Sequence, residues 1–175
     1  MEGNFKTRLD WHHDELSADA SQIQGAYEAA VGAFLVTFNG IENTINEIIY
    51  FAMHKCERPD ILKRLQSDSF SRKLITLELI SLVFPRVAQR SLTDKLRYIA
   101  SQRNDLAHGH FKQNPFDGTY EIVTRSKSRS QSTAEIVRLT KRAKQCWQDL
   151  RYFEAYFEFE DLAEDGSHQD DAPTE

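Results

Sequence analysis

The sequence predicts an all-α fold: an antiparallel helical bundle of four to five helices with a small β-hairpin insert after the fourth helix. Apolar residues recur every three or four positions over long stretches, as they do on one face of a helix. Serines, prolines and glycines stand at the ends of those stretches, where helices begin and end. One segment, residues 110–125, alternates instead in the manner of two short strands. Amphipathic helices joined by short links pack most economically as an antiparallel bundle.

The first helix follows from a long apolar series that ends near Lys55. The series contains Ile23, Tyr27, Ala30, Phe34, Phe38, Ile41, Ile45, Ile48 and Ala52. Ser17 or Ser21 is expected to cap the helix. Glycines recur within it: Gly25, Gly32 and Gly40. Because glycine lowers helix stability, each of them is a place for a break or a bend.

The next two helices are shorter and are bounded by prolines. Pro59 occupies an early position of a helix expected over 61–66, where its missing N–H group matters least. A third helix is expected over 71–84, and Pro85 ends it. Its side chains are so rich in apolar character that the helix is expected to be well buried.

The fourth helix is expected between Ser91 and Gly109. The spacing of Ser91 and Asp94 suits a capping arrangement, and Gly109 is well placed to end the helix. The hairpin follows directly, with an Asn-Pro-Phe-Asp-Gly turn at 114–118. The side chains expected on its packed face are Phe111, Tyr120 and Ile122. Residues 126–131 are then predicted to be a mobile polar linker.

The last helix opens with a capping box, in which Ser132 and Glu135 satisfy each other's backbone N–H groups. Its apolar positions are Ile136, Leu139, Ala143, Trp147, Leu150, Phe153 and Phe157. Residues 1–162 are expected to form a single helical domain, and the acidic residues 163–175 a disordered tail. Apolar surface left over on the first and last helices predicts either a dimer face or more intramolecular core.

Composition narrows the class of protein. The formal net charge of −5 argues against indiscriminate nucleic-acid binding. Cys56 and Cys146 lie far apart and form no zinc or disulfide pattern, so we expect reduced thiols, no metal and no cofactor. The amino-terminal residues lack an apolar signal segment, and no later stretch is apolar enough to cross a bilayer. A soluble cytoplasmic protein without membrane contact is predicted.

Three polar residues at the end of the fourth helix suggest chemistry. Arg103 is expected to project from the apolar side, where a cation needs an anion. Asn104 and His108 are four residues apart and share a neighbouring face. This combination suits cleavage of an RNA phosphodiester: imidazole removes the proton from a 2'-hydroxyl, and guanidinium binds charge on the phosphoryl oxygens. A two-fold dimer that brings both copies of His108 together would supply the second proton donor.

These residues also resemble a known family. The run Arg103-Asn104-Asp105-Leu106-Ala107-His108-Gly109 is similar to the R-x(4-6)-H motif of HEPN domains, including the polar residue after the arginine. The resemblance implies an HEPN-like helical domain over 1–162, usually dimeric, whose active members are metal-independent endoribonucleases of toxin–antitoxin, antiviral defence and RNA-processing systems. It further implies that Arg103 and His108 are catalytic, that Asn104 supports them, and that a cognate antitoxin or defence-complex partner exists.

Supporting residues and rival interpretations complete the prediction. Glu42 either orients Arg103 or His108, or forms a plain intramolecular salt bridge. His110 is either a second acid or a hairpin residue. The basic stretch 124–144 either holds RNA or is a solvated face, and its candidate RNA-binding residues are Arg125, Lys127, Arg129, Arg138 and Lys141. The rival functions are a catalytically inactive helical module that binds a partner protein or nucleotide, and a structural dimerisation subunit.

Overall fold

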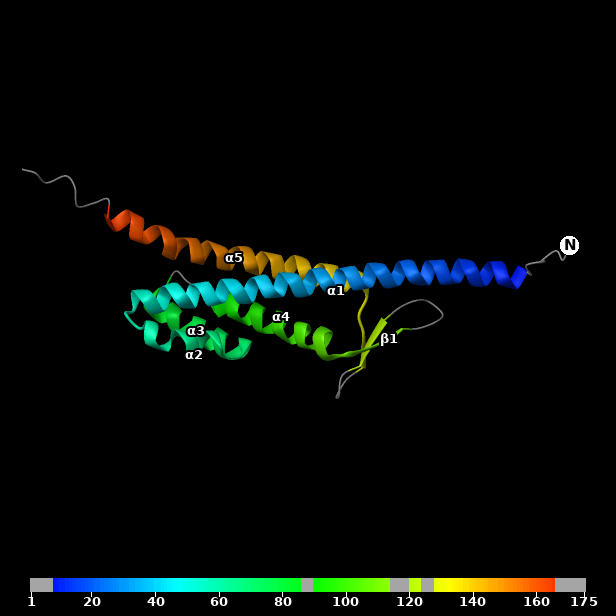
Figure 1. The fold of residues 1–175 in the computed structure, drawn as a ribbon, viewed down its shortest axis with the longest axis horizontal. Helices are drawn as coiled ribbons and strands as arrows, with labels where there is room; N and C mark the ends of the chain where they lie inside the picture. Colours follow the sequence, from blue (N-terminus) through cyan, green and yellow to red (C-terminus); the bar gives the residue numbers. More distant parts are fainter. Residues whose placement is uncertain (1–7, 86–89, 114–119, 124–127, 166–175) are drawn as a thin grey trace, which may run out of the picture. The chain divides into compact units, whose positions relative to one another are not determined.

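The computed structural model describes residues 8–85, 90–113, 120–123 and 128–165, with side chains over 21–85, 91–109, 111–112, 120, 122–123 and 130–157 (Figure 1). In chain order its elements are α1 (Arg8–Lys55), the 3-10 turn η1 (Pro59–Ile61), α2 (Leu62–Gln66), α3 (Phe70–Val83), α4 (Arg90–His108), β1 (His110–Gln113), β2 (Tyr120–Val123), β3 (Ser128–Ser130) and α5 (Thr133–Asp165). The predicted all-α class with a small antiparallel hairpin is confirmed.

Helix α1 begins earlier than the sequence predicts. It starts at Arg8, so Ser17 and Ser21 lie inside the helix and cap nothing at its start. The glycines within α1 do not interrupt it, because it continues without a break to Lys55. Each glycine lowers the stability of a helix by about 1 kcal/mol relative to alanine. Tertiary packing along the many turns of α1 outweighs this loss.

The chain divides into two compact units. We call Met1–Leu35 with Gln102–Thr140 the sheet unit, and Val36–Ser101 with Lys141–Glu175 the helical unit. Helices α1, α4 and α5 contribute residues to both units, so the single domain over 1–162 stays a prediction. Helix α5 continues to Asp165, past the expected start of the tail at 163, and residues 166–175 lie outside the described residues.

The sheet unit holds an antiparallel sheet with the strand order β1-β2-β3. Tyr27 of α1 packs against this sheet. Its ring stacks on the Tyr120 ring with 4.3 Å between the ring centroids, and it meets the Phe111 ring edge-on with 5.9 Å between the centroids. Burial raises the pKa of the Tyr27 phenol to about 12. Strand β3 lies in the predicted linker, where Ile122 pairs with Arg129, so part of that linker is ordered by backbone pairing. Ile122 itself is buried.

The end of α4 is fixed by the sheet. The Gly109 N–H donates a hydrogen bond to the Asp105 carbonyl at 2.9 Å, which closes the last turn. A Cβ atom at Gly109 would overlap the Ile122 side chain and the Asp105 carbonyl oxygen. Glycine is therefore needed here because β2 approaches the helix end closely.

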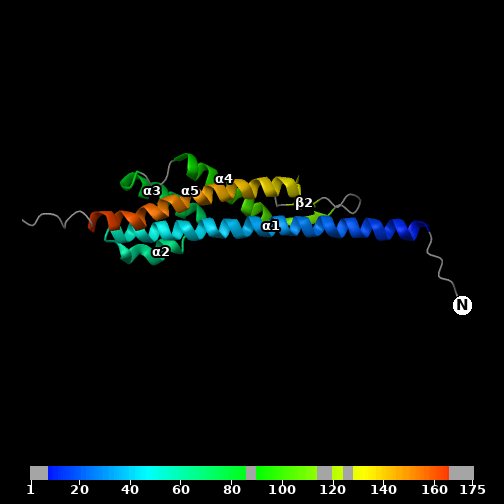
Figure 2. The ribbon, with the colours of Figure 1, turned by 90° about the horizontal axis from the view of Figure 1, so that it is seen from above.

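The helical unit is built around the second half of α1, whose buried side chains include Phe38, Ile41, Ile45, Ile48 and Ile49. Within this unit α5 runs parallel to α1. Trp147 of α5 donates a hydrogen bond to the Thr44 hydroxyl of α1 at 3.0 Å, and Phe157, later in α5, lies against Lys55, later in α1. Both views show these two helix segments side by side, with α4 running in the opposite direction (Figures 1 and 2).

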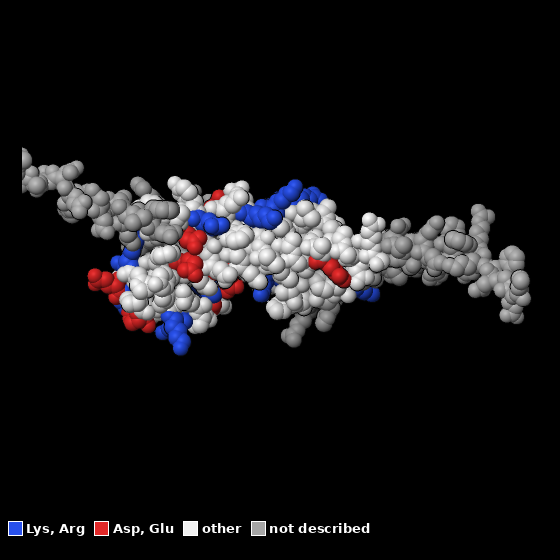
Figure 3. Space-filling model, turned by 45° about the horizontal axis from the view of Figure 1, so that its top comes forward, with Lys and Arg blue, Asp and Glu red and all other residues white. Residues whose placement is uncertain are grey.

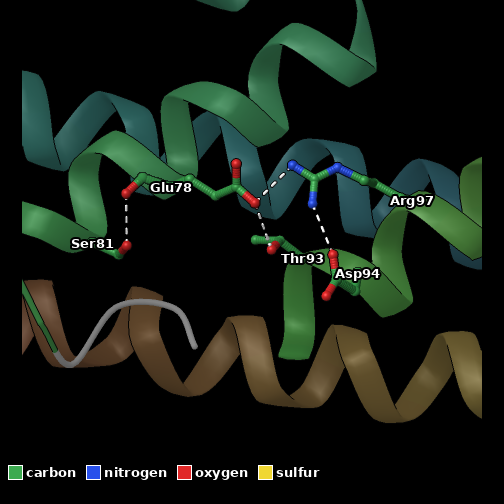
Figure 4. A network of polar contacts seen from close by, with 5 residues as sticks. All are labelled: Glu78, Ser81, Thr93, Asp94 and Arg97. Atoms are coloured by element: carbon green, nitrogen blue, oxygen red, sulfur yellow. Dashed lines mark hydrogen bonds and ion pairs between the residues drawn. The ribbon is translucent and has the colours of Figure 1, made fainter. Parts of the chain in front are cut away.

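A polar network joins α3 to α4 (Figure 4). The Glu78 carboxylate accepts hydrogen bonds from the buried Thr93 hydroxyl at 2.8 Å and from Arg97 Nη2 at 2.7 Å. Arg97 also binds Asp94 at 3.0 Å. Because one carboxylate serves two donors on the neighbouring helix, the network fixes the register of α3 against α4.

The prediction that the third helix is well buried holds for one of its faces only. One face of α3 is buried, through Leu74, Leu77 and Ile80. The opposite face exposes an aliphatic stripe: Ile75 is 52% exposed, Leu79 59%, Leu82 77% and Val83 64%. A helix packed on one side buries only the residues of that side, whatever the hydrophobicity of the others. Exposed apolar side chains of the described helical unit thus lie on α3 as well as on the first and last helices, where Val36 is 71% and Tyr152 75% exposed.

Gly40 and Gly32 of α1 should respond oppositely to alanine. A Cβ at Gly40 would lie 2.6 Å from Trp147 Cζ2, and the Trp147 ring is held by its hydrogen bond to Thr44. Gly40→Ala is therefore expected to lower the free energy of unfolding by about 1–3 kcal/mol in urea denaturation. A Cβ at Gly32 meets no described atom within 4 Å. Gly32→Ala is expected to raise the free energy of unfolding by up to about 1 kcal/mol. If the two variants changed this free energy equally, the close packing of Trp147 on Gly40 would be contradicted.

Candidate functional site

The motif residues occupy the last turns of α4. The buried residues of this helix are Leu92, Thr93, Leu96, Ile99, Gln102 and Leu106. Arg103 lies beside this buried face and is half-buried, so Gln102, 7% exposed, occupies the inward position that the sequence assigns to Arg103. The guanidinium is consequently set at the edge of the buried face, where it remains accessible.

Arg103 and Asn104 are brought together, and His108 is on the surface. Arg103 Nη1 donates a hydrogen bond to Asn104 Oδ1 at 3.3 Å. Asn104 and His108 are both exposed, one helical turn apart. At 3.6 residues per turn, Arg103 and His108 lie about 140° apart around the helix axis and about 7.5 Å apart along it. The side chains of Arg103 and His108 therefore point in different directions from the same helix.

The position of His108 suits a cation. It is the basic residue of the last turn of α4, where carbonyl groups without helical partners leave partial negative charge. His108 is also exposed, so a bound substrate can reach its imidazole.

Glu42 belongs to the helical unit and has a different partner. Its carboxylate accepts a hydrogen bond from Lys73 Nζ at 2.9 Å, and the Lys73 side chain is only 5% exposed. Of the two interpretations of Glu42, the structure therefore contains the intramolecular salt bridge, with Lys73 on α3 as the cation. A role of Glu42 toward Arg103 or His108 stays a prediction.

The remaining candidate residues are only partly described. His110 opens β1 and Arg129 lies within β3, but their side chains are outside the described residues, as are Arg125 and Lys127 altogether. Arg138 and Lys141 on α5 are exposed. Figure 3 shows lysine and arginine side chains in several groups on one face of the molecule.

Sequence reasoning missed a hollow in the helical unit. Between α4 and α5 lies a cavity of about 530 Å³, lined by Asp94, Lys95, Tyr98, Ile99, Arg142, Gln145 and Cys146. A smaller hollow of about 260 Å³ shares Lys95 and is lined also by Ser91, Leu92, Asp149, Tyr152 and Phe153. No sequence pattern marks such a cavity, because it arises only when two helices are packed together.

Comparisons with known proteins leave the family open: no family model, curated protein or solved structure matches the chain. Within the described residues, no group of three or more histidine, cysteine, aspartate or glutamate side chains could hold a metal ion. None of the described helices contains an 18-residue stretch apolar enough to span a membrane.

Proposed function

We propose that the protein is a metal-independent endoribonuclease of the HEPN type. The observation that carries the proposal is the placement of the motif at the end of α4: His108 is exposed, Asn104 lies one turn before it, and Arg103 is bonded to Asn104. A phosphate can approach Asn104 and His108 in this position, because both side chains are exposed.

The proposed reaction is an internal transfer at phosphorus. Imidazole removes the 2'-hydroxyl proton, the O2'–P bond forms and the P–O5' bond breaks. The leaving O5' takes a proton from a second acid, and the products carry a 2',3'-cyclic phosphate and a 5'-hydroxyl. Arg103 would bind the charge that accumulates on the non-bridging oxygens, and Asn104 would hold Arg103 in place.

The site is proposed to be composite, from two copies of the chain. Because Arg103 and His108 diverge by about 140° on one helix, a single copy presents them poorly to one phosphate. A two-fold axis beside α4 would supply two imidazoles, one as base and one as acid. The exposed aliphatic stripe on α3 is apolar surface that dimer formation could cover.

The proposed substrate is RNA, and the proposed partner is a cognate antitoxin. Single-stranded or loop RNA would offer a flexible 2'-hydroxyl, and the exposed Arg138 and Lys141 would contact its phosphates. A toxin or antiviral defence role, restrained by a cognate antitoxin, would follow from such an activity. The alternative is a catalytically inactive helical module that binds a partner protein or nucleotide.

Cleavage of a synthetic RNA in excess EDTA tests the proposal. The full-length protein is expected to yield 2',3'-cyclic phosphate ends, and a 2'-O-methyl nucleotide is expected to block cleavage at its own position only. The control is a double variant that carries Arg103→Ala and His108→Ala and is purified in parallel. Any cleavage by this variant measures contaminating nuclease. Cleavage that requires a metal ion, or that proceeds equally in the double variant, would contradict the proposal. Absence of cleavage together with binding of a partner would favour the inactive module.

A further inference from the structure

We propose that the cavity between α4 and α5 in the helical unit is a binding site for a small aromatic anion, that is, a flat ring system joined to an acidic group. This site shares no residue with the motif at the end of α4, and the inference does not depend on the proposed ribonuclease activity. Its support comes from the size of the cavity, the charges on its rim and the side chains that line it.

The cavity has the dimensions and the floor of a small-molecule site. Its volume of about 530 Å³ lies within the range of about 300–1,000 Å³ that is usual for such sites. Ile99 on α4 and Cys146 on α5 form an apolar floor, and they are 1% and 3% exposed. Burial raises the pKa of the Cys146 thiol, so the floor is an uncharged surface.

The rim of the cavity is positively charged. Lys95 on α4 and Arg142 on α5 are both exposed, and neither forms a hydrogen bond or ion pair within the described part of the chain. The Asp94 carboxylate, which also lines the cavity, accepts a hydrogen bond from Arg97 Nη1 at 3.0 Å, and Arg97 is shared with Glu78. Asp149 lies in the smaller hollow that shares Lys95. Lys95 and Arg142, neither of them held in an ion pair by a described residue, favour a ligand whose acidic group meets the rim while its body fills the cavity.

Tyr98 favours an aromatic body over an aliphatic chain. Its ring is 47% exposed and lines the cavity, so one ring face or edge is available to a ligand. Aromatic pairs gain attraction beyond the area that they bury, and an arginine guanidinium can stack on the same ring system. An aliphatic anion would use the floor and the rim but would gain nothing from Tyr98.

Binding of 8-anilinonaphthalene-1-sulfonate to the folded full-length protein tests the site. We expect one bound probe per chain by titration calorimetry, with enhanced fluorescence. Lys95→Ala and Arg142→Ala are each expected to weaken binding about tenfold. Tyr98→Leu should weaken probe binding several-fold, and Lys95→Arg should keep the affinity of the parent protein. Matched controls are Lys144→Ala and Tyr152→Leu, which change exposed side chains that do not line this cavity. Equal affinity in all variants would overturn the proposal.

Cys146 provides a second, independent measurement. In a Cys56→Ser protein, alkylation by N-ethylmaleimide reports on Cys146 alone, because Cys56 is the other cysteine of the chain. Probe at a few times its dissociation constant is expected to slow this alkylation several-fold in the Cys56→Ser protein. It should slow it only slightly when Lys95→Ala is added, because the weaker site is then mostly empty. Inorganic phosphate should give no protection. If decanoate protects as well as the aromatic probe, the assignment to an aromatic anion is wrong.

Discussion

Replacing His108 with glutamine is expected to lower the rate constant for RNA cleavage by about 100- to 10,000-fold, the usual contribution of a general acid or base. Glutamine keeps much of the polar volume of histidine but cannot exchange a proton near neutral pH. The substitution lies at an exposed helix end, so the fold should be retained. Single-turnover cleavage in excess EDTA, with thermal unfolding measured on the same samples, gives the comparison.

His54→Gln is the matched control, because His54 is also an exposed histidine near the end of a helix. It should leave the rate unchanged. Arg103→Lys should retain part of the activity, because lysine keeps the charge but loses the two-pronged geometry, and Arg103→Ala should lose more. A His108→Gln protein as active as His54→Gln would remove His108 from the proposed mechanism.

Replacing Glu42 with alanine is expected to have the largest effect on stability, about 3 kcal/mol in the free energy of unfolding measured with urea. The change leaves the Lys73 ammonium group buried without its counter-charge, since the Lys73 side chain is 5% exposed. Glu42 is itself 31% exposed, which places the loss at the lower end of the range for buried ion pairs.

Two controls separate this effect from ordinary charge removal. Asp68→Ala breaks the pair between Asp68 and Arg72, whose arginine is 73% exposed, and should cost less than about 0.5 kcal/mol. The double variant Glu42→Leu with Lys73→Met removes both charges and should be close to the parent in stability. If the double variant is as unstable as Glu42→Ala, the loss comes from packing and not from an unpaired charge.

Some local signals in the sequence predicted helix ends well. The caps expected at Ser17 or Ser21 and at Ser91 are wrong, because α1 begins at Arg8 and α4 at Arg90. Pro59 starts the 3-10 turn before α2, and Pro85 follows the end of α3. Ser132 and Glu135 form the predicted capping box: Ser132 N donates to Glu135 Oε2 at 2.8 Å, and Glu135 N donates to Ser132 Oγ at 3.3 Å. Such signals work because the groups that satisfy each other are only a few residues apart.

Features that depend on distant neighbours could not be predicted in the same way. The polar residues before Ser17 carry no apolar series, yet α1 begins at Arg8. Strand β3 consists of serine and arginine, and its pairing with β2 supplies what its composition lacks. On α3 the sequence could not say which face would be covered, because both faces are aliphatic.

The candidate site was predicted in its location more accurately than in its orientation. The motif does end α4, with His108 in the last turn and Gly109 directly after it. A period of 3.6 residues, however, permits either Gln102 or Arg103 to face inward, and a rotation of one residue decides between them. The structure buries Gln102 and places Arg103 beside Asn104. The cavity lined by Lys95 and Arg142 depends on two helices that are distant in sequence.

The course of α1, α4 and α5 through both units limits how the chain can be dissected. Each boundary between the units falls within a helix: after Leu35, after Ser101 and after Thr140. A recombinant fragment containing one unit would consist of separate pieces, and each severed helix would expose backbone amides and carbonyls that had been hydrogen-bonded. Expression of isolated halves, and limited proteolysis aimed at a flexible connector, should therefore give unfolded products, whereas the uncut polypeptide retains its structure.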